Sequence, residues 1–205
     1  MNVTTLSVHW SSRKESAESC AQRLHEYLSM LEQQCNELKW FKKGETKKQA
    51  MEEGGSINDF DLDKLTALVA KATNKKDVGN EIIEELGFRL SFWNRQPEDT
   101  SMSLSVYCGC YHPSFLNNVI LDLPEKLDYY QFDDVKLKDL LLKTAKIWGA
   151  DYGGIYNSRT EAFRSSPIGE PYFDKMLWVA DSLSFNPQTK AESIEKTIDG
   201  TFYKK

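Results

Sequence analysis

A length of 205 residues is enough for one large domain that buries its own core, so no disulfide or metal is needed to hold the chain together. A net charge of −5 argues against binding to a nucleic-acid backbone, because proteins with that function usually carry a basic surface. No apolar run approaches the roughly 20 residues of a membrane helix, and no secretory signal or linker is visible, so we expect a single cytoplasmic domain over residues 1–205.

The N-terminal part of the chain predicts a strand followed by a long helix. Residues 4–10 alternate apolar and polar side chains, which is typical of a half-buried strand. Apolar side chains then recur every three or four residues over 17–38, the pattern of an amphipathic helix. Ser12 and Glu15 have the spacing of a capping box, which predicts that they begin this helix.

Residues 40–79 predict a shorter helix after an exposed excursion. A basic run and a glycine pair between residues 40 and 55 indicate a solvated segment. Asn58 or Asp59 can then cap a helix. Its apolar side chains would be Leu62, Leu65, Leu68 and Val69.

Three short runs between residues 86 and 124 carry the clearest strand pattern. Residues 88–92 and 102–108 alternate apolar and polar side chains, and 119–123 is nearly all apolar and stops at Pro124. Turn-forming residues separate the runs. Short breaks of this kind predict an antiparallel meander, which we expect to be the central sheet.

The C-terminal part adds one buried helix and further strands. Asp133 and Asp134 are candidate N-caps for a helix that carries a broad apolar face and stops at Gly149. Strands are predicted at 151–156, 176–180 and 200–203. Helices and strands without regular alternation favour an α+β fold. In it, a central antiparallel sheet around residues 87–123 would pack against the long N-terminal helix and a helix near 134–148.

Catalytic motifs are absent from the sequence. It contains no nucleophile elbow, phosphate-binding loop or zinc-protease helix. Cys108 and Cys110 are predicted to share one face of a strand, with His112 just beyond, but no second Cys/His pair completes a zinc site and the chain turns away at Pro113. Two interpretations of Cys108 and Cys110 therefore remain open: a cysteine site, or two small residues of the core. Burial of Cys20 and Cys35 in the long helix also remains open. We predict no catalytic, cofactor-binding or metal-binding residue.

One acidic segment resembles half of a calcium loop. Asp59, Asp61 and Asp63 have the alternate spacing, but Lys64 and Ala70 stand where that loop needs glycine and glutamate. The remaining interpretations are an acidic helix start and an acidic surface that faces a partner.

Several framework motifs together are similar to a known family. They are the run from Leu86 to Asn94, Cys108-Gly, the run from Asn118 to Pro124, a helix ending in Trp148, and Leu177-Trp-Val. This combination resembles the immunity protein 52 family of bacterial polymorphic toxin systems. The family's tryptophan-and-proline step after the long helix is replaced here by Trp148-Gly-Ala-Asp-Tyr.

The resemblance implies a non-enzymatic inhibitor that binds a cognate toxin effector and needs no cofactor, nucleic acid or membrane. The family's toxins resemble nucleases with a restriction-endonuclease-type fold, delivered between cells by secretion systems such as type VI. An acidic protein suits a basic nuclease surface. The candidate toxin-binding residues are Asp59, Asp61, Asp63, Glu98, Asp99, Asp128, Tyr129, Tyr130, Phe132, Asp133 and Asp134.

Alternative interpretations accompany this one. The aromatic residues at 129, 130 and 132 are either exposed anchors for a partner or packing for the helix that follows. A secretion chaperone or adaptor that carries an effector without inhibiting it has the same composition. An enzyme that uses Cys108, Cys110 and His112 is the third hypothesis.

Overall fold

The computed structural model describes residues 3–35, 38–43, 55–76, 79, 81–167, 169–185, 187 and 191–205. Its centre is an antiparallel sheet with the strand order β2-β3-β4-β5-β1-β6-β7-β9-β8. The strands are β1 (Thr4–Trp10), β2 (Phe41–Lys42), β3 (Phe88–Trp93), β4 (Ser103–Cys108), β5 (Asn117–Asp122), β6 (Tyr152–Asn157), β7 (Met176–Ala180), β8 (Ser193–Lys196) and β9 (Gly200–Lys204). The helices are α1 (Ala17–Gln34), α3 (Leu62–Lys71), α4 (Asp134–Trp148) and α5 (Glu161–Arg164), with 3-10 turns η1 (Ile57–Asp59), η2 (Glu84–Leu86) and η3 (Leu127–Tyr130).

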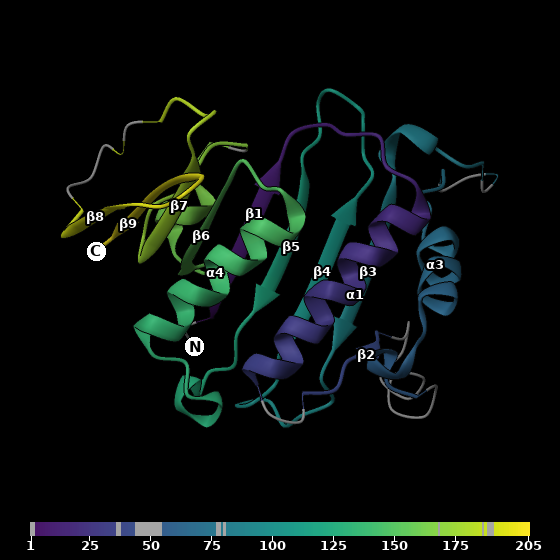
Figure 1. The fold of residues 1–205 in the computed structure, drawn as a ribbon, viewed down its shortest axis with the longest axis horizontal. Helices are drawn as coiled ribbons and strands as arrows, with labels where there is room; N and C mark the ends of the chain where they lie inside the picture. Colours follow the sequence, from purple (N-terminus) through teal and green to yellow (C-terminus); the bar gives the residue numbers. More distant parts are fainter. Residues whose placement is uncertain are drawn as a thin grey trace.

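One face of the sheet is covered by helices. Figure 1 shows α1 and α4 lying across this face, with α3 beside α1 near β3. The main core fills the space between them, and Trp10 of β1 stacks on Trp148 of α4 with ring centroids 5.4 Å apart. On the other face, a smaller apolar cluster of Tyr152, Phe173, Leu177 and Val179 forms where the chain from α5 to β7 crosses. The α+β prediction, with both helices against the sheet, is confirmed.

The meander prediction is confirmed, but its place in the sheet differs. β3, β4 and β5 are consecutive antiparallel neighbours, as the alternation predicts. They form one half of the sheet, because β1 inserts beside β5 and joins it to β6. The central strand is therefore the predicted strand at residues 4–10.

The predicted helix starts need two corrections. Ser16, and not Ser12, caps α1, because its side chain accepts a hydrogen bond from the backbone N–H of Ser19. Asp61, and not Asn58 or Asp59, caps α3 by accepting from the N–H of Lys64. The long helix also ends at Gln34, four residues before the apolar pattern stops.

The C-terminal predictions are largely confirmed. Asp133 caps α4 by accepting from the N–H of Lys136, and Gly149 ends the helix in the left-handed conformation. Strands occupy the three predicted positions. The structure adds α5 between β6 and β7, and the edge strand β8. It also places β2 in the predicted excursion, of which residues 44–54 lie outside the described residues.

Candidate functional site

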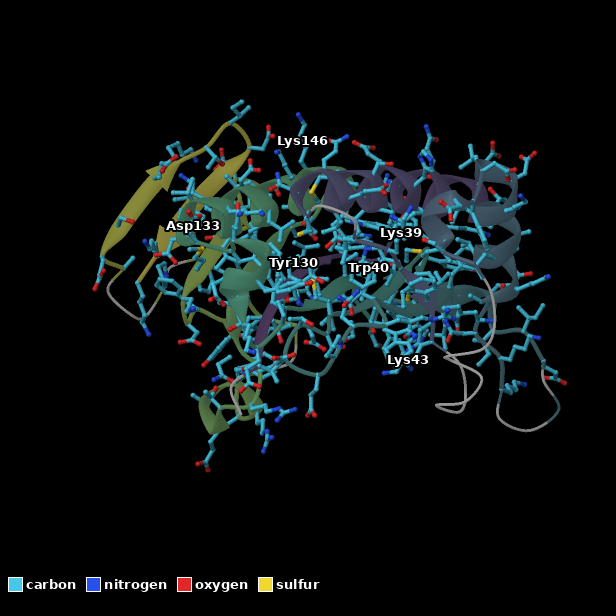
Figure 2. All side chains as sticks on the ribbon, turned by 90° about the horizontal axis from the view of Figure 1, so that it is seen from below. Lys39, Trp40, Lys43, Tyr130, Asp133 and Lys146 are labelled. Carbon is cyan, nitrogen blue, oxygen red and sulfur yellow. The ribbon has the colours of Figure 1, made fainter. Side chains whose placement is uncertain are left out.

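The predicted acidic residues gather at one end of the sheet. The β3–β4 connection and the segment after β5 both leave the sheet at the lower end in Figure 1, where α1 also ends. Seen from this end in Figure 2, Asp133, Tyr130, Trp40 and Lys39 follow one another across the molecule. Lys39 in turn pairs with Asp59. We call this surface the acidic end: Asp59, Asp61, Asp63, Glu98, Asp99, Asp128, Asp133 and Asp134.

Part of the charge of the acidic end is neutralised within the protein. Asp59 pairs with Lys39 at 3.4 Å, Asp99 with Lys126 at 2.5 Å and Asp134 with Lys204 at 2.7 Å. Asp61 and Asp133 are occupied as helix caps. Among the residues that the structure describes, Asp63, Glu98 and Asp128 are the carboxylates of the acidic end with neither an ion pair nor a helix-cap hydrogen bond. Changing these three side chains would therefore break no ion pair and no helix cap.

Only one of the three predicted aromatic anchors is exposed. Tyr129 has 59% of its surface exposed, whereas Tyr130 and Phe132 are buried in the main core. The hydroxyl of Tyr130 accepts a hydrogen bond from the side-chain amide of Asn94, which is itself buried. The packing interpretation is therefore correct for Tyr130 and Phe132, and the expectation that they are exposed is wrong.

The cysteines do not form a reactive group. Cys108 forms a hydrogen bond with Cys20 of α1. This hydrogen bond, together with burial, raises the pKa of the Cys108 thiol. Cys110 bonds instead to the hydroxyl of Tyr107, because Gly109 has a positive φ of 71° and reverses the direction of the chain. The prediction that both thiols share one face is therefore wrong.

His112 lies apart from these thiols, against the ring of Phe115. Its Nδ1 accepts a hydrogen bond from the backbone N–H of Ser114. Within the described ranges, no group of three or more potential metal ligands comes together. Over the same residues, no helix has the length and apolar character to cross a membrane.

Sequence reasoning missed a cavity on the face of the sheet opposite α1 and α4. It has a volume of about 280 Å³ and lies between the sheet and the segment around α5. The alternation of β1 already places Ser7 and His9 opposite the core side chains. No pattern in residues 157–171 showed that this segment folds back over them.

A buried charged cluster joins the start of α1 to the end of α4. The Glu15 side chain is 5% exposed and lies 3.3 Å from Arg13 Nε and 3.1 Å from an Arg23 terminal nitrogen. Both arginines donate to the backbone carbonyl of Trp148. Glu15 thus orients two guanidinium groups toward the carbonyl at the end of α4, which is a structural task.

Comparisons with known proteins identify the family. The model of the family "Immunity protein 52" matches residues 5–160, so the match includes the N-terminal strand and the long helix but ends before the Leu177-Trp-Val motif. The chain belongs to the immunity protein 52 family. A search of curated proteins finds no match.

Among solved structures, the chain is similar to the Pseudomonas aeruginosa T6SS protein PA0821, with 11% sequence identity and a TM-score of 0.49. The alignment covers 100% of this chain and 65% of that protein, so the chain spans about two thirds of its length.

Proposed function

We propose that this protein neutralises a cognate toxin in the cytoplasm by binding it through the acidic end. Membership of an immunity protein family supports a role as a non-enzymatic inhibitor. The choice of this surface rests on one observation, which is that three separate acidic segments lie at one end of the sheet. The partner that suits this surface is basic, and a nuclease toxin of the restriction-endonuclease type is the expected one.

The sharpest test of this surface reverses the charge of three carboxylates, because their substitution breaks no ion pair or helix cap described above. The triple variant Asp63→Lys, Glu98→Lys and Asp128→Lys is expected to weaken toxin binding by roughly tenfold or more. Wild-type affinity should fall as salt concentration rises, and the variant's affinity should depend less on salt. Calorimetry with catalytically inactive toxin at two salt concentrations measures both effects.

The control reverses the same number of exposed acidic residues away from the acidic end: Glu18, Glu26 and Glu84. It matches the change in net charge, so a general charge effect would weaken both triple variants equally. Binding that is unchanged in the first variant and independent of salt would show that the acidic end is not the interface.

Growth of cells that make the toxin in the cytoplasm tests the inhibitory role itself. Co-expression of this protein should restore growth. A secretion adaptor would bind the toxin without restoring growth, so that result would replace the immunity function with the adaptor alternative.

A further inference from the structure

The cavity opposite α1 and α4 is walled by aromatic rings. Tyr156 of β6 stacks on Phe163 of α5 with centroids 4.4 Å apart and an interplanar angle of 20°. Tyr172 meets the ring of Tyr156 edge-on at 5.7 Å. His9 and Tyr152 stack at 5.0 Å on the central strands. Rings from β1, β6 and the segment around α5 therefore surround one space of about 280 Å³.

The floor of this cavity is polar but uncharged. The Tyr156 hydroxyl donates to Ser7 Oγ at 3.1 Å, and Ser7 Oγ lies 2.9 Å from His9 Nε2. Burial lowers the pKa of His9 to about 4, so its imidazole is neutral at pH 7. The three floor groups satisfy one another and offer no ion to a ligand.

Among the described residues that line the cavity, two have charged side chains, and their charges are opposite in sign. Arg164 and Glu170 both belong to exposed positions of the segment over the sheet. Their charges offset each other, so the lining itself carries no net charge. Its volume lies at the lower end of the range for small-molecule pockets, which suits one ring system and is too small for a nucleotide with its phosphates.

We propose that this cavity binds an uncharged aromatic group of the size of an indole or a phenol. Such a ring would stack against the aromatic walls, and its polar edge would face the hydroxyl groups of the floor. The same chemistry is available from a free small molecule and from a tryptophan or tyrosine side chain of the toxin. The second source rests on the proposed function, whereas the pocket itself does not.

Titration of the full chain with four ring-sized probes tests the proposal. Indole and p-cresol should cause saturable NMR shifts in the amides of β1 and β6. Benzoate and benzamidinium have a similar size but carry opposite charges, and they should bind more weakly than the two neutral probes. Absence of saturable shifts with indole and p-cresol would overturn the proposal, as would tighter binding of either charged probe.

A filling variant locates the binding. Ile120 lines the cavity from β5, so Ile120→Trp should abolish the indole shifts. Ile194→Trp makes the same substitution at an exposed position of β8 and should leave them unchanged. If Ile120→Trp does not fold, Phe163→Ala removes one wall from a half-buried position of the short helix α5 and should weaken indole binding. Indole binding that survives in a folded variant with the cavity filled or opened would place the site elsewhere.

A final titration distinguishes the two sources. Indole is added to the complex with inactive toxin. Loss of the shifts at β1 and β6 identifies a side chain of the toxin as the occupant, and retention identifies a free small molecule. Failure of the protein to bind any toxin would refute the proposed function but would leave the probe titrations of the free chain valid.

Discussion

At the scale of single residues, Gly153 sets how closely the strands and α4 approach. A Cβ at this position would lie 2.6 Å from Val8 Cγ1 and 2.8 Å from the Ser7 carbonyl oxygen. Both neighbours belong to the fully packed strand β1, so neither has room to move. The glycine that weakened the strand pattern in the sequence is thus a requirement of the packing.

Gly153→Ala is therefore expected to lower the free energy of unfolding by about 1–3 kcal/mol through overpacking. Gly55→Ala is the matched control, because a Cβ there meets nothing within 4 Å. It should change stability by less than about 0.5 kcal/mol. Urea denaturation of both variants measures the difference, and equal stabilities would contradict the close approach.

His9 makes stability depend on pH. Its pKa is lowered by burial from 6.5 to about 4, so between these values the unfolded state binds a proton that the folded state does not. Stability contributed by the neutral imidazole is present above pH 6.5 and is lost as pH falls toward 4. The loss should be on the order of 3 kcal/mol.

The His9→Gln variant isolates this contribution from that of the carboxylates. Its free energy of unfolding should fall less between pH 6.5 and 4 than that of the wild type in the same buffers. Parallel curves for the two proteins would show that His9 is not buried as a neutral group.

The residue-scale errors of sequence reasoning share one cause. Ser12 and Ser16 are both good caps, and so are Asp59 and Asp61, so composition does not decide between neighbouring candidates. The selection is made by tertiary contacts: Glu15, the partner expected for Ser12, is held instead by Arg13 and Arg23.

At the scale of elements, the same cluster connects two helices that are distant in the sequence. Arg13 and Arg23 pair with Glu15 and donate to Trp148 O at 2.9 and 3.0 Å. The start of α1 and the end of α4 are thus held together by one buried carboxylate. Removing its charge leaves two guanidinium groups near each other without a counter-ion.

Glu15→Gln should lower the free energy of unfolding by about 2–4 kcal/mol, because one partner of a buried ion pair is removed. Glu18→Gln is the control, since Glu18 lies three residues after Glu15, in the first turn of α1, but is exposed. It should change stability by less than about 0.5 kcal/mol. Thermal and urea denaturation of the pair test this, and a neutral effect of Glu15→Gln would show that the cluster contributes no net stability.

Strong periodicity determined which elements could be predicted. β1, β3, β4 and α4 carry clear patterns and lie where residue spacing places them. β8 has four exposed residues and therefore no alternation to detect. The cavity depends on how the segment around α5 folds over the sheet, and that arrangement leaves no signal in the segment's own sequence.

At the scale of the whole molecule, the order of the strands brings distant segments together. The meander was predictable because its strands are neighbours in the sequence. The insertion of β1 between β5 and β6 was not, since nothing local specifies a partner so far along the chain. The acidic end has the same origin: the topology brings three acidic segments that are distant in the sequence to one end of the sheet (Figure 1).

All four cysteines are buried, and none forms a disulfide. Burial raises the pKa of Cys35 to about 11, so its thiol stays protonated at pH 8. We expect no thiol to react with a water-soluble disulfide reagent at pH 8 until denaturant unfolds the chain. Release of one equivalent of product from the native protein would revive the hypothesis of a cysteine enzyme.

The central position of β1 also delays the moment at which a newly made chain can complete its sheet. Thr5 bonds to Asp122 and Ser158, which follow it by 117 and 153 residues. A ribosome that adds about 5–20 residues per second needs roughly ten to thirty seconds to reach the second of these partners. Until then β1 can pair with β5 but not with β6, so the two halves of the sheet stay unjoined until most of the chain has been made.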